Sequence, residues 1–104
     1  MKVTSKYELT EDARQNWLYF DVYARRIILD GLRVQLVESD PEEETWHKGR
    51  LKTPVAAATH KVDIEKWRAF YLVERTASSV MSIVVLIGEK RGNKLFVKGK
   101  EFQT

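Results

Sequence analysis

The sequence has 104 residues, a 43% share of hydrophobic residues and a formal net charge of +3, which together predict one globular domain spanning residues 1–104. It contains no cysteine, which excludes disulfides, thiolate catalysis and zinc sites built on sulfur, and which favours a reducing compartment, by default the cytoplasm. The first residues form no apolar signal segment, and the apolar run 83–87 is too short to span a bilayer, so we expect neither export nor membrane association.

The first third of the chain predicts one strand followed by two helices. Apolar and polar residues alternate over residues 3–9, as in a half-buried strand. Thr10 is placed to cap a short helix that ends near Asp21, and a longer helix follows over residues 22–38. The apolar stripe of the longer helix comprises Ala24, Ile27, Ile28, Leu32 and Gln35 or Leu36. We therefore expect a helical hairpin that packs on a sheet.

The chain beyond Pro41 predicts a solvated acidic loop to about residue 49 and then strands. A strand can begin at residues 50–52, whereas Pro54 disfavours a central strand and leaves residues 53–59 ambiguous. Stronger strand patterns cover residues 60–65, 67–75, 80–87 and 95–97, with turns at 77–79 and 89–93. The order predicts an α+β fold: an N-terminal strand, a helical hairpin and three to four antiparallel strands, with the helices packed on one face of the sheet.

The hairpin over residues 60–75 is the most informative stretch of the chain. If Glu65 and Lys66 form a two-residue turn, Asp63 faces Arg68 across the strands, and Lys61 lies next along the same face. Two cations and one acid then converge on one surface of the sheet. This arrangement is either a functional site or a solvated face with a structural ion pair between Asp63 and Arg68.

The two histidines give no metal-binding pattern. His47 and His60 are thirteen residues apart without a supporting cluster of ligands, so we predict no metal site and no other cofactor. His60 falls on the apolar side of its strand and is expected to be a packed core or strand-edge histidine, whereas His47 lies in the loop and stays open as a candidate.

Positive charge is concentrated in the second part of the chain. Residues 1–44 carry a net charge of −4 and residues 45–104 a net charge of +7, which suggests a polyanion-binding surface on the later strands. The aromatic residues Trp46, Phe70 and Phe96 lie among the cations, as stacking on unpaired bases requires. Charge near sheet edges also prevents aggregation, so the pattern alone leaves a purely structural reading open. The cations concerned are Arg50, Lys52, Lys61, Arg68, Lys90, Arg91 and Lys94.

The order of these segments resembles the RelE/ParE superfamily of type II toxin-antitoxin toxins, and is closer to its RelE-like branch. "LTEDARQNWLYF" is similar to the family's opening helix, and "LRVQLVESDP" to its second helix and the turn before a proline. "GRLK", "HKVDIEKWRAFYLVE" and "SIVVLIGEKR" are similar to three successive segments of the family's sheet. The resemblance covers nearly the whole chain, although each motif alone is degenerate.

The resemblance implies a toxin that cleaves mRNA, typically on the ribosome, through attack of the ribose 2′-hydroxyl and without a metal. By position, Arg68 would stabilise the phosphorane, Lys61 would bind phosphate or act as base, and Lys90 or Arg91 would supply a further cation. Arg50, Lys52, Lys94 and Phe96 complete the expected RNA-binding set.

Two positions depart from the family pattern. Asp63 stands where the RelE branch carries a second Lys or Arg, and could itself be the base. Phe96 replaces the family's terminal-strand tyrosine and cannot donate a proton, so the acid would be Lys90, Arg91 or His47.

The sequence therefore leads to three hypotheses. The first is a cytoplasmic endoribonuclease toxin, with mRNA, the ribosome and a cognate antitoxin as partners. The second is a ParE-like DNA gyrase inhibitor, and the third is a catalytically inactive relative that binds RNA.

Overall fold

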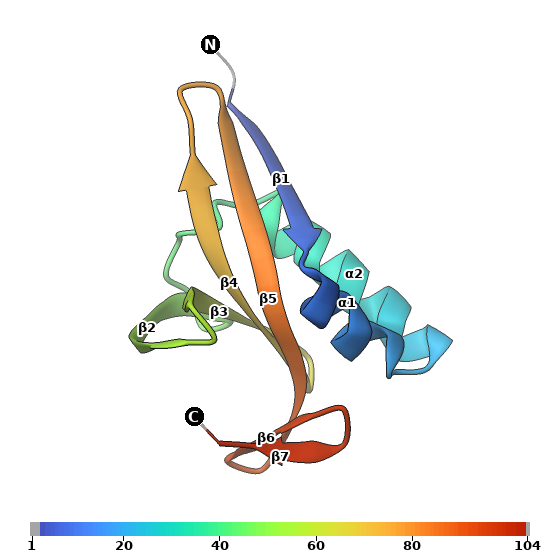
Figure 1. Cartoon of the computed structure of the whole chain (residues 1–104). Helices are drawn as coiled ribbons and strands as arrows, with labels where there is room; N and C mark the ends of the chain where they lie inside the picture. Colours follow the sequence, from blue (N-terminus) through green and yellow to red (C-terminus); the bar gives the residue numbers. More distant parts are fainter. Residues whose placement is uncertain (1–2, 104) are drawn as a thin grey trace.

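A computed structural model describes residues 3–103 of the chain (Figure 1). The helices are α1 (Glu11–Leu18) and α2 (Val22–Leu36). The strands are β1 (Thr4–Leu9), β2 (Lys48–Val55), β3 (Ala58–Ile64), β4 (Trp67–Arg75), β5 (Ser79–Arg91), β6 (Lys94–Val97) and β7 (Lys100–Phe102).

Both helices begin at capping residues, and the cap predicted at Thr10 is confirmed. The Thr10 hydroxyl accepts a hydrogen bond from the Ala13 amide, and Asp21 caps α2 in the same way through the Ala24 amide. The predicted stripe of α2 is confirmed, because Ala24, Ile28, Leu32 and Leu36 are its buried residues. Helix α1 is fixed to the sheet by Asn16, whose side-chain oxygen accepts from the Ile87 amide of β5.

The strands form one sheet in the order β2-β3-β4-β5-β6-β7, and every neighbouring pair in that order is antiparallel. Strand β1 lies off this path and pairs in parallel with β5. The predicted hairpin is confirmed in register: Ile64 pairs with Trp67 and Asp63 with Arg68, around the turn at Glu65 and Lys66. Pro54 lies in β2, which is an edge strand, as its missing amide donor requires.

Apolar residues cover both faces of the sheet. The larger cluster packs α1 and α2 against one face, with Val62, Ala69 and Ile87 among its fully or almost fully buried members. A second cluster lies on the other face and is built from Ala58, Phe70, Leu86 and Leu95, with Leu51, Val55, Val85, Val97 and Phe102 packed around them. Strands β6 and β7 supply part of the second cluster, so the sheet curls and its second face is not simply a solvated surface.

The predicted α+β fold is therefore wrong. Strands make up 50% of the chain and helices 23%, and the six antiparallel strands β2–β7 curl into half a barrel instead of the predicted three to four antiparallel strands beneath a helical hairpin. The prediction fails at residues 89–93, where the sequence indicates a turn. Strand β5 instead continues to Arg91, and a tight turn at Gly92 and Asn93 leads into β6 and then β7. The long β5 and the β6–β7 hairpin below it are visible in Figure 1.

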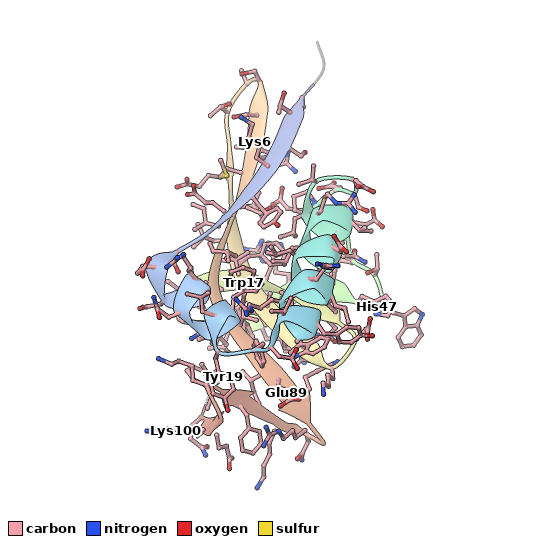
Figure 2. The ribbon with its side chains drawn as sticks, turned by 90° about the vertical axis from the view of Figure 1, so that its right-hand side faces the viewer. Lys6, Trp17, Tyr19, His47, Glu89 and Lys100 are labelled. Atoms are coloured by element: carbon pink, nitrogen blue, oxygen red, sulfur yellow. The ribbon has the colours of Figure 1, made fainter. Side chains whose placement is uncertain are left out.

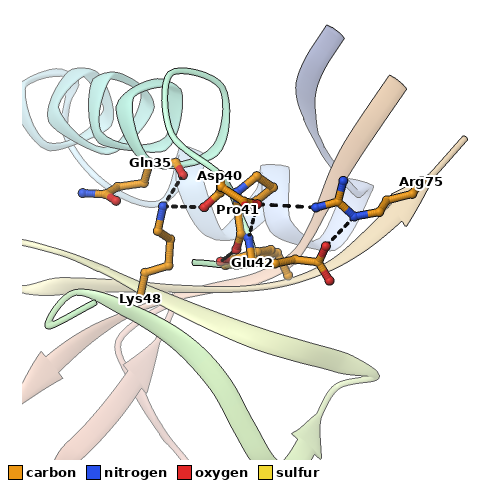
Figure 3. Close-up of polar contacts among 7 residues, drawn as sticks. Gln35, Asp40, Pro41, Glu42, Lys48 and Arg75 are labelled. Atoms are coloured by element: carbon orange, nitrogen blue, oxygen red, sulfur yellow. Dashed lines mark hydrogen bonds and ion pairs between the residues drawn. The ribbon is translucent and has the colours of Figure 1, made fainter. Parts of the chain in front are cut away.

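The acidic loop between α2 and β2 is held in place by three side chains (Figure 3). Lys48 is buried, and its ammonium donates to the carbonyl oxygens of Gln35 and Asp40 at 2.9 and 2.8 Å. The hydroxyl of Tyr71 donates to the Pro41 carbonyl at 2.5 Å, and Arg75 forms ion pairs with loop carboxylates. The loop predicted to be merely solvated is thus fastened to the sheet and to the end of α2.

In the part of the chain that the structure describes, no helix combines the length and apolar character needed to cross a membrane.

Candidate nucleic-acid interface

A cavity of about 560 Å³ lies on the face of the sheet that the β6–β7 hairpin partly covers. Its apolar walls come from the second hydrophobic cluster, including Phe70, Leu95 and Phe102. Four cations also line it: Lys61, Arg68, Lys90 and Lys94. The cavity therefore combines apolar surface with concentrated positive charge, which is the composition that a nucleotide requires.

Three of these cations surround Asp63, and we call Lys61, Arg68 and Lys90 the cation cluster. The Arg68 guanidinium makes a bidentate contact with the Asp63 carboxylate, with Nε–Oδ1 at 2.6 Å and a second nitrogen to Oδ2 at 3.2 Å. The ammonium nitrogens of Lys90 and Lys61 lie 3.5 and 3.8 Å from Oδ2. One carboxylate thus faces three cations, which leaves the group with a net charge of +2.

Strand alternation explains how these side chains meet. Lys61 and Asp63 are two residues apart on β3, so they share a face, and Arg68 joins them from the directly opposite position on β4. Arg68 in turn pairs with Gly88 on β5, and Lys90 lies two residues beyond Gly88 on the same face. A side chain at Gly88 would collide with Leu95 and with the Phe96 carbonyl, so glycine at this position lets β6 pack closely against β5 beside the cluster.

The cation cluster stabilises the ionised form of Asp63. Burial alone raises the pKa of this carboxyl, since its side chain is only 14% exposed. The hydrogen bond from Arg68 and the positive charges of Arg68, Lys61 and Lys90 outweigh that effect, and the pKa of Asp63 lies below its ordinary value. Asp63 is therefore an anion at neutral pH and accepts hydrogen bonds only.

Lys94 lies at the rim of the cavity, away from the cation cluster. Its ammonium nitrogen is 3.7 Å from the Glu101 carboxylate of β7. Among the residues predicted to bind RNA, namely Arg50, Lys52, Lys94 and Phe96, Lys94 is the one that lines the cavity.

Arg91 and Phe96 lie together but outside the cavity lining. The Arg91 guanidinium lies 4.5 Å from the centre of the Phe96 ring and also bonds to Glu89. Arg91 follows Lys90 in β5, so its side chain points to the opposite face. This pair is thus separate from the cation cluster, although both residues were predicted to join it.

Arg50 and Lys52 are exposed on edge strand β2, and neither lines the cavity. Arg50 is paired with His60 in the β2–β3 register, on the face opposite Lys61, and its amide donates to Glu44. Of the eight cations and aromatic residues predicted for the site, four line the cavity, namely Lys61, Arg68, Lys90 and Lys94, and Asp63 lies beside them.

The two histidines differ in environment. His60 is buried, stacks on Tyr71 and forms a hydrogen bond with Thr59, which confirms the predicted packed histidine. Burial and the nearby charge of Arg50 lower the pKa of His60. His47 is exposed beside α2 (Figure 2), and its carbonyl accepts from the Asp63 amide at 2.6 Å. It lines a separate cavity that Asp63 also reaches.

Within residues 3–103, no group of three or more His, Cys, Asp or Glu side chains is arranged to hold a metal ion. No protein-family model matches the chain, and no curated protein matches it either. Function is therefore inferred from the residues that line the cavity and from their contacts.

Sequence reasoning missed the contribution of β7. Glu101, Phe102 and Gln103 line the cavity beside Lys94, and none of them was a candidate. A strand of three residues is too short for a recognisable alternation, although the tight turn at Lys98 and Gly99, both with positive φ, follows the usual pattern of a two-residue hairpin. The tip of this hairpin contacts Tyr19 at the end of α1, as Figure 2 shows.

Proposed function

We propose that this chain is a RelE-like endoribonuclease that cleaves mRNA on the ribosome and acts as the toxin of a type II toxin-antitoxin pair. The observation that carries the proposal is the convergence of Lys61, Arg68 and Lys90 on Asp63 beside a cavity with apolar walls. Cations suit a phosphate, and apolar walls suit an unpaired base. The sequence resemblance supports the same reaction, and an antitoxin would neutralise the toxin by covering this basic face.

The reaction requires three contributions from the protein: a base, an acid and positive charge. The ribose 2′-hydroxyl attacks the adjacent phosphorus and loses its proton, the P–O5′ bond breaks, and the departing 5′-oxygen gains a proton. The products are a 2′,3′-cyclic phosphate and a 5′-hydroxyl. Positive charge must also stabilise the phosphorane that forms between these steps.

We assign the role of base to Asp63 and the stabilisation of the phosphorane to Arg68. Asp63 is the anionic acceptor nearest the phosphate-binding cations, so it takes the proton of the 2′-hydroxyl, although its lowered pKa makes it a weak base. Arg68 is held in position by its bidentate contact with Asp63, and its remaining N–H groups are left to bind the phosphorane oxygens. Lys61 lies 3.8 Å from Asp63 Oδ2 within the cation cluster and is assigned to phosphate binding.

Lys90 is assigned the protonation of the leaving oxygen, because it belongs to the cation cluster. His47 lines a separate cavity together with residues of α2 and is not assigned this role. Arg91 faces the other side of β5 and is not assigned this role.

Cleavage of mRNA on programmed ribosomes tests the proposal, with mapped 5′ ends and identification of the cyclic phosphate as readouts. The intact chain should cut translated mRNA and leave 5′-hydroxyl ends, and Arg68→Ala should reduce the rate by roughly 10²-fold or more. Arg14→Ala, an exposed change on α1, serves as the matched control and should cut normally. Intact mRNA with wild-type protein would refute the proposal, and DNA breaks on expression would favour gyrase inhibition.

One observation favours a second candidate function, that of an RNA-binding protein that does not cut. The bidentate pair between Asp63 and Arg68 already occupies the guanidinium fork, as a structural ion pair does. In that case wild-type protein should bind RNA tightly and leave it intact. Asp63→Asn would then increase RNA affinity, because it removes the negative charge from the cluster.

A further inference from the structure

One edge of strand β1 has no partner strand. β1 pairs in parallel with β5 and with no other strand of the described residues 3–103. In Figure 1 no strand lies beyond β1 on the side away from β5. The sheet therefore ends at β1 along this side, and a row of backbone donors and acceptors faces outward.

The hydrogen bonds to β5 show which residues of β1 supply the outward groups. The Thr4 amide donates to the Ser78 carbonyl at 3.1 Å, and the Thr10 amide donates to the Val84 carbonyl at 2.9 Å. Because backbone direction alternates along a strand, the even-numbered residues of β1 face β5 and the odd-numbered residues face away from it. Within residues 3–103, these odd-numbered residues make no backbone hydrogen bond to any element other than β5. They are Ser5, Tyr7 and Leu9.

The other two edges of the sheet are less suited to accept a strand. Edge strand β2 carries Pro54, which has no amide donor, and its register with β3 shifts between Arg50 and Val55. Edge strand β7 is only three residues long. In contrast, β1 has six residues and pairs with β5 without a register shift. A regular, open edge of this length is a template for a further strand.

The exposed face of β1 carries one cation and one anion without partners. Lys6 and Glu8 are two residues apart on the strand, so they share a face, and both are exposed. Figure 2 shows Lys6 above both helices. Within residues 3–103, neither side chain takes part in an ion pair. This pattern is complementary to itself when the strand is reversed.

We propose that the chain forms a two-fold symmetric dimer in which β1 pairs with β1 of a second copy, antiparallel and with Tyr7 opposite Tyr7. In this register Lys6 of each copy faces Glu8 of the other, and the outward groups of Ser5 face those of Leu9. Three residue pairs then exchange two hydrogen bonds each, and the two sheets join into one. The inference goes beyond the proposed function, because no residue of β1 lines the cavity with the cation cluster.

The charges select this register over its neighbours. The outward backbone groups pair only when odd-numbered residues face each other, so the strands can slip only in steps that keep this match. The two nearest alternatives place Lys6 opposite Lys6 or Glu8 opposite Glu8. Like charges directly opposite destabilise a strand pair, whereas opposite charges stabilise it. The register with two Lys6–Glu8 pairs is therefore favoured.

Sedimentation velocity of the whole chain at low ionic strength tests the dimer. The wild-type protein should change from monomer to dimer as its concentration rises toward about 1 mM, because one strand pair is a small interface. Lys6→Glu alone, or Glu8→Lys alone, places like charges in both symmetric pairs and should raise the dissociation constant by about tenfold. The double variant Lys6→Glu/Glu8→Lys restores opposite charges and should recover the wild-type dissociation constant.

The control for charge reversal is Lys52→Glu on edge strand β2. Lys52 is exposed on a different edge of the sheet, so this variant should dimerise as the wild type does. Thermal melts of dilute samples should match for all variants, since Lys6, Glu8 and Lys52 are exposed.

Disulfide trapping tests the register, because the chain contains no cysteine of its own. Residues directly opposite in an antiparallel pair lie within the Cα separation of about 4.4–6.8 Å that a disulfide spans. A mixture of Lys6→Cys and Glu8→Cys proteins should therefore form a linked heterodimer on mild oxidation. Lys6→Cys alone should cross-link more slowly, because residue 6 lies diagonally from residue 6 of the other copy.

Four results would overturn the inference. They are a wild-type chain that stays monomeric up to about 1 mM, a dimer that Lys52→Glu weakens as much as Lys6→Glu does, a double variant that does not recover, and equal cross-linking in every cysteine combination. A chain that is monomeric alone but accepts a strand from a different protein would also exclude pairing between copies. Cleavage of mRNA is measured separately, so its absence would refute the proposed function and leave the dimer standing.

Discussion

Replacement of Asp63 by Asn removes the anion on which three cations converge. The expected loss in the free energy of unfolding follows from the contacts that Asp63 makes. The bidentate bond to Arg68 is charge-assisted and its acceptor is largely buried, which is worth about 1.5–3 kcal/mol. The contacts to Lys61 and Lys90 are longer and more exposed, and contribute a few tenths of a kcal/mol each. The Asn amide retains part of the hydrogen bonding but leaves the cations to repel one another. We therefore expect Asp63→Asn to lower the free energy of unfolding by about 2 kcal/mol.

Urea denaturation and thermal melting at neutral pH measure this loss. For a domain of this size, 2 kcal/mol lowers the Tm by roughly 10 °C. Asp30→Asn is the matched control, because Asp30 is exposed on α2 and makes only a long contact with Arg33. A Tm for Asp63→Asn within a degree or two of this control would refute the reasoning, because the ion pairs would then contribute nothing to stability.

The acid limb of the stability curve gives a second readout of the same change. The pKa of Asp63 in the folded protein lies below the unfolded value of about 3.9, so the unfolded state binds more protons between the two values. The stabilisation from Asp63 is therefore complete above the unfolded pKa and is lost as the pH falls through the folded pKa. Asp63→Asn should flatten this part of the curve, and an unchanged acid limb would contradict the assignment.

Three further predictions concern stability and binding. Ala57 has a positive φ in the β2–β3 turn, so Ala57→Gly should raise the unfolding free energy in urea by about 0.5–1 kcal/mol, whereas Ala77→Gly, in a turn without positive φ, should lower it. Lys48→Met removes two part-buried hydrogen bonds, one to Gln35 at the end of α2 and one to Asp40 in the acidic loop, and should cost about 2–3 kcal/mol in the same assay, against less than about 0.5 for the exposed Lys52→Met. RNA affinity should fall with salt with a log–log slope of about −2 to −3, from roughly −0.7 for each of three or four phosphate contacts, and a flat dependence would exclude phosphate binding by the cation cluster.

Local features of this fold were predictable from the sequence because short-range chemistry decides them. The Thr10 cap, the buried stripe of α2 and the register of the β3–β4 hairpin all follow from spacing within a few residues. That register also predicted that Lys61, Asp63 and Arg68 share a face. Alternation along a strand and a two-residue turn were sufficient for this part of the site.

The fold class and the rest of the site depend on the curl of the sheet, which no local pattern encodes. Glu89 and Arg91 are charged residues before a glycine and resemble a turn, yet Glu89 is held in β5 opposite Trp67 and bonds to Lys66. That extension is what carries β6 and β7 onto the second face. Glu101 and Phe102 reach the cavity only through this long-range arrangement, so their position could not be read from their own segment.

The parallel pairing of β1 with β5 also constrains the order in which the chain can fold. Thr4 pairs with Ser79 and Leu9 with Val84, so the first strand to leave the ribosome has its partner near the far end of the chain. Closure of so long a loop is entropically costly and slows folding. Strand β5 also pairs with β4, so its arrival provides pairing for β1 and β4 together, and β6 joins it afterwards. Until β5 is synthesised, β1 has no partner in the sheet, and its backbone donors and acceptors are open to other chains.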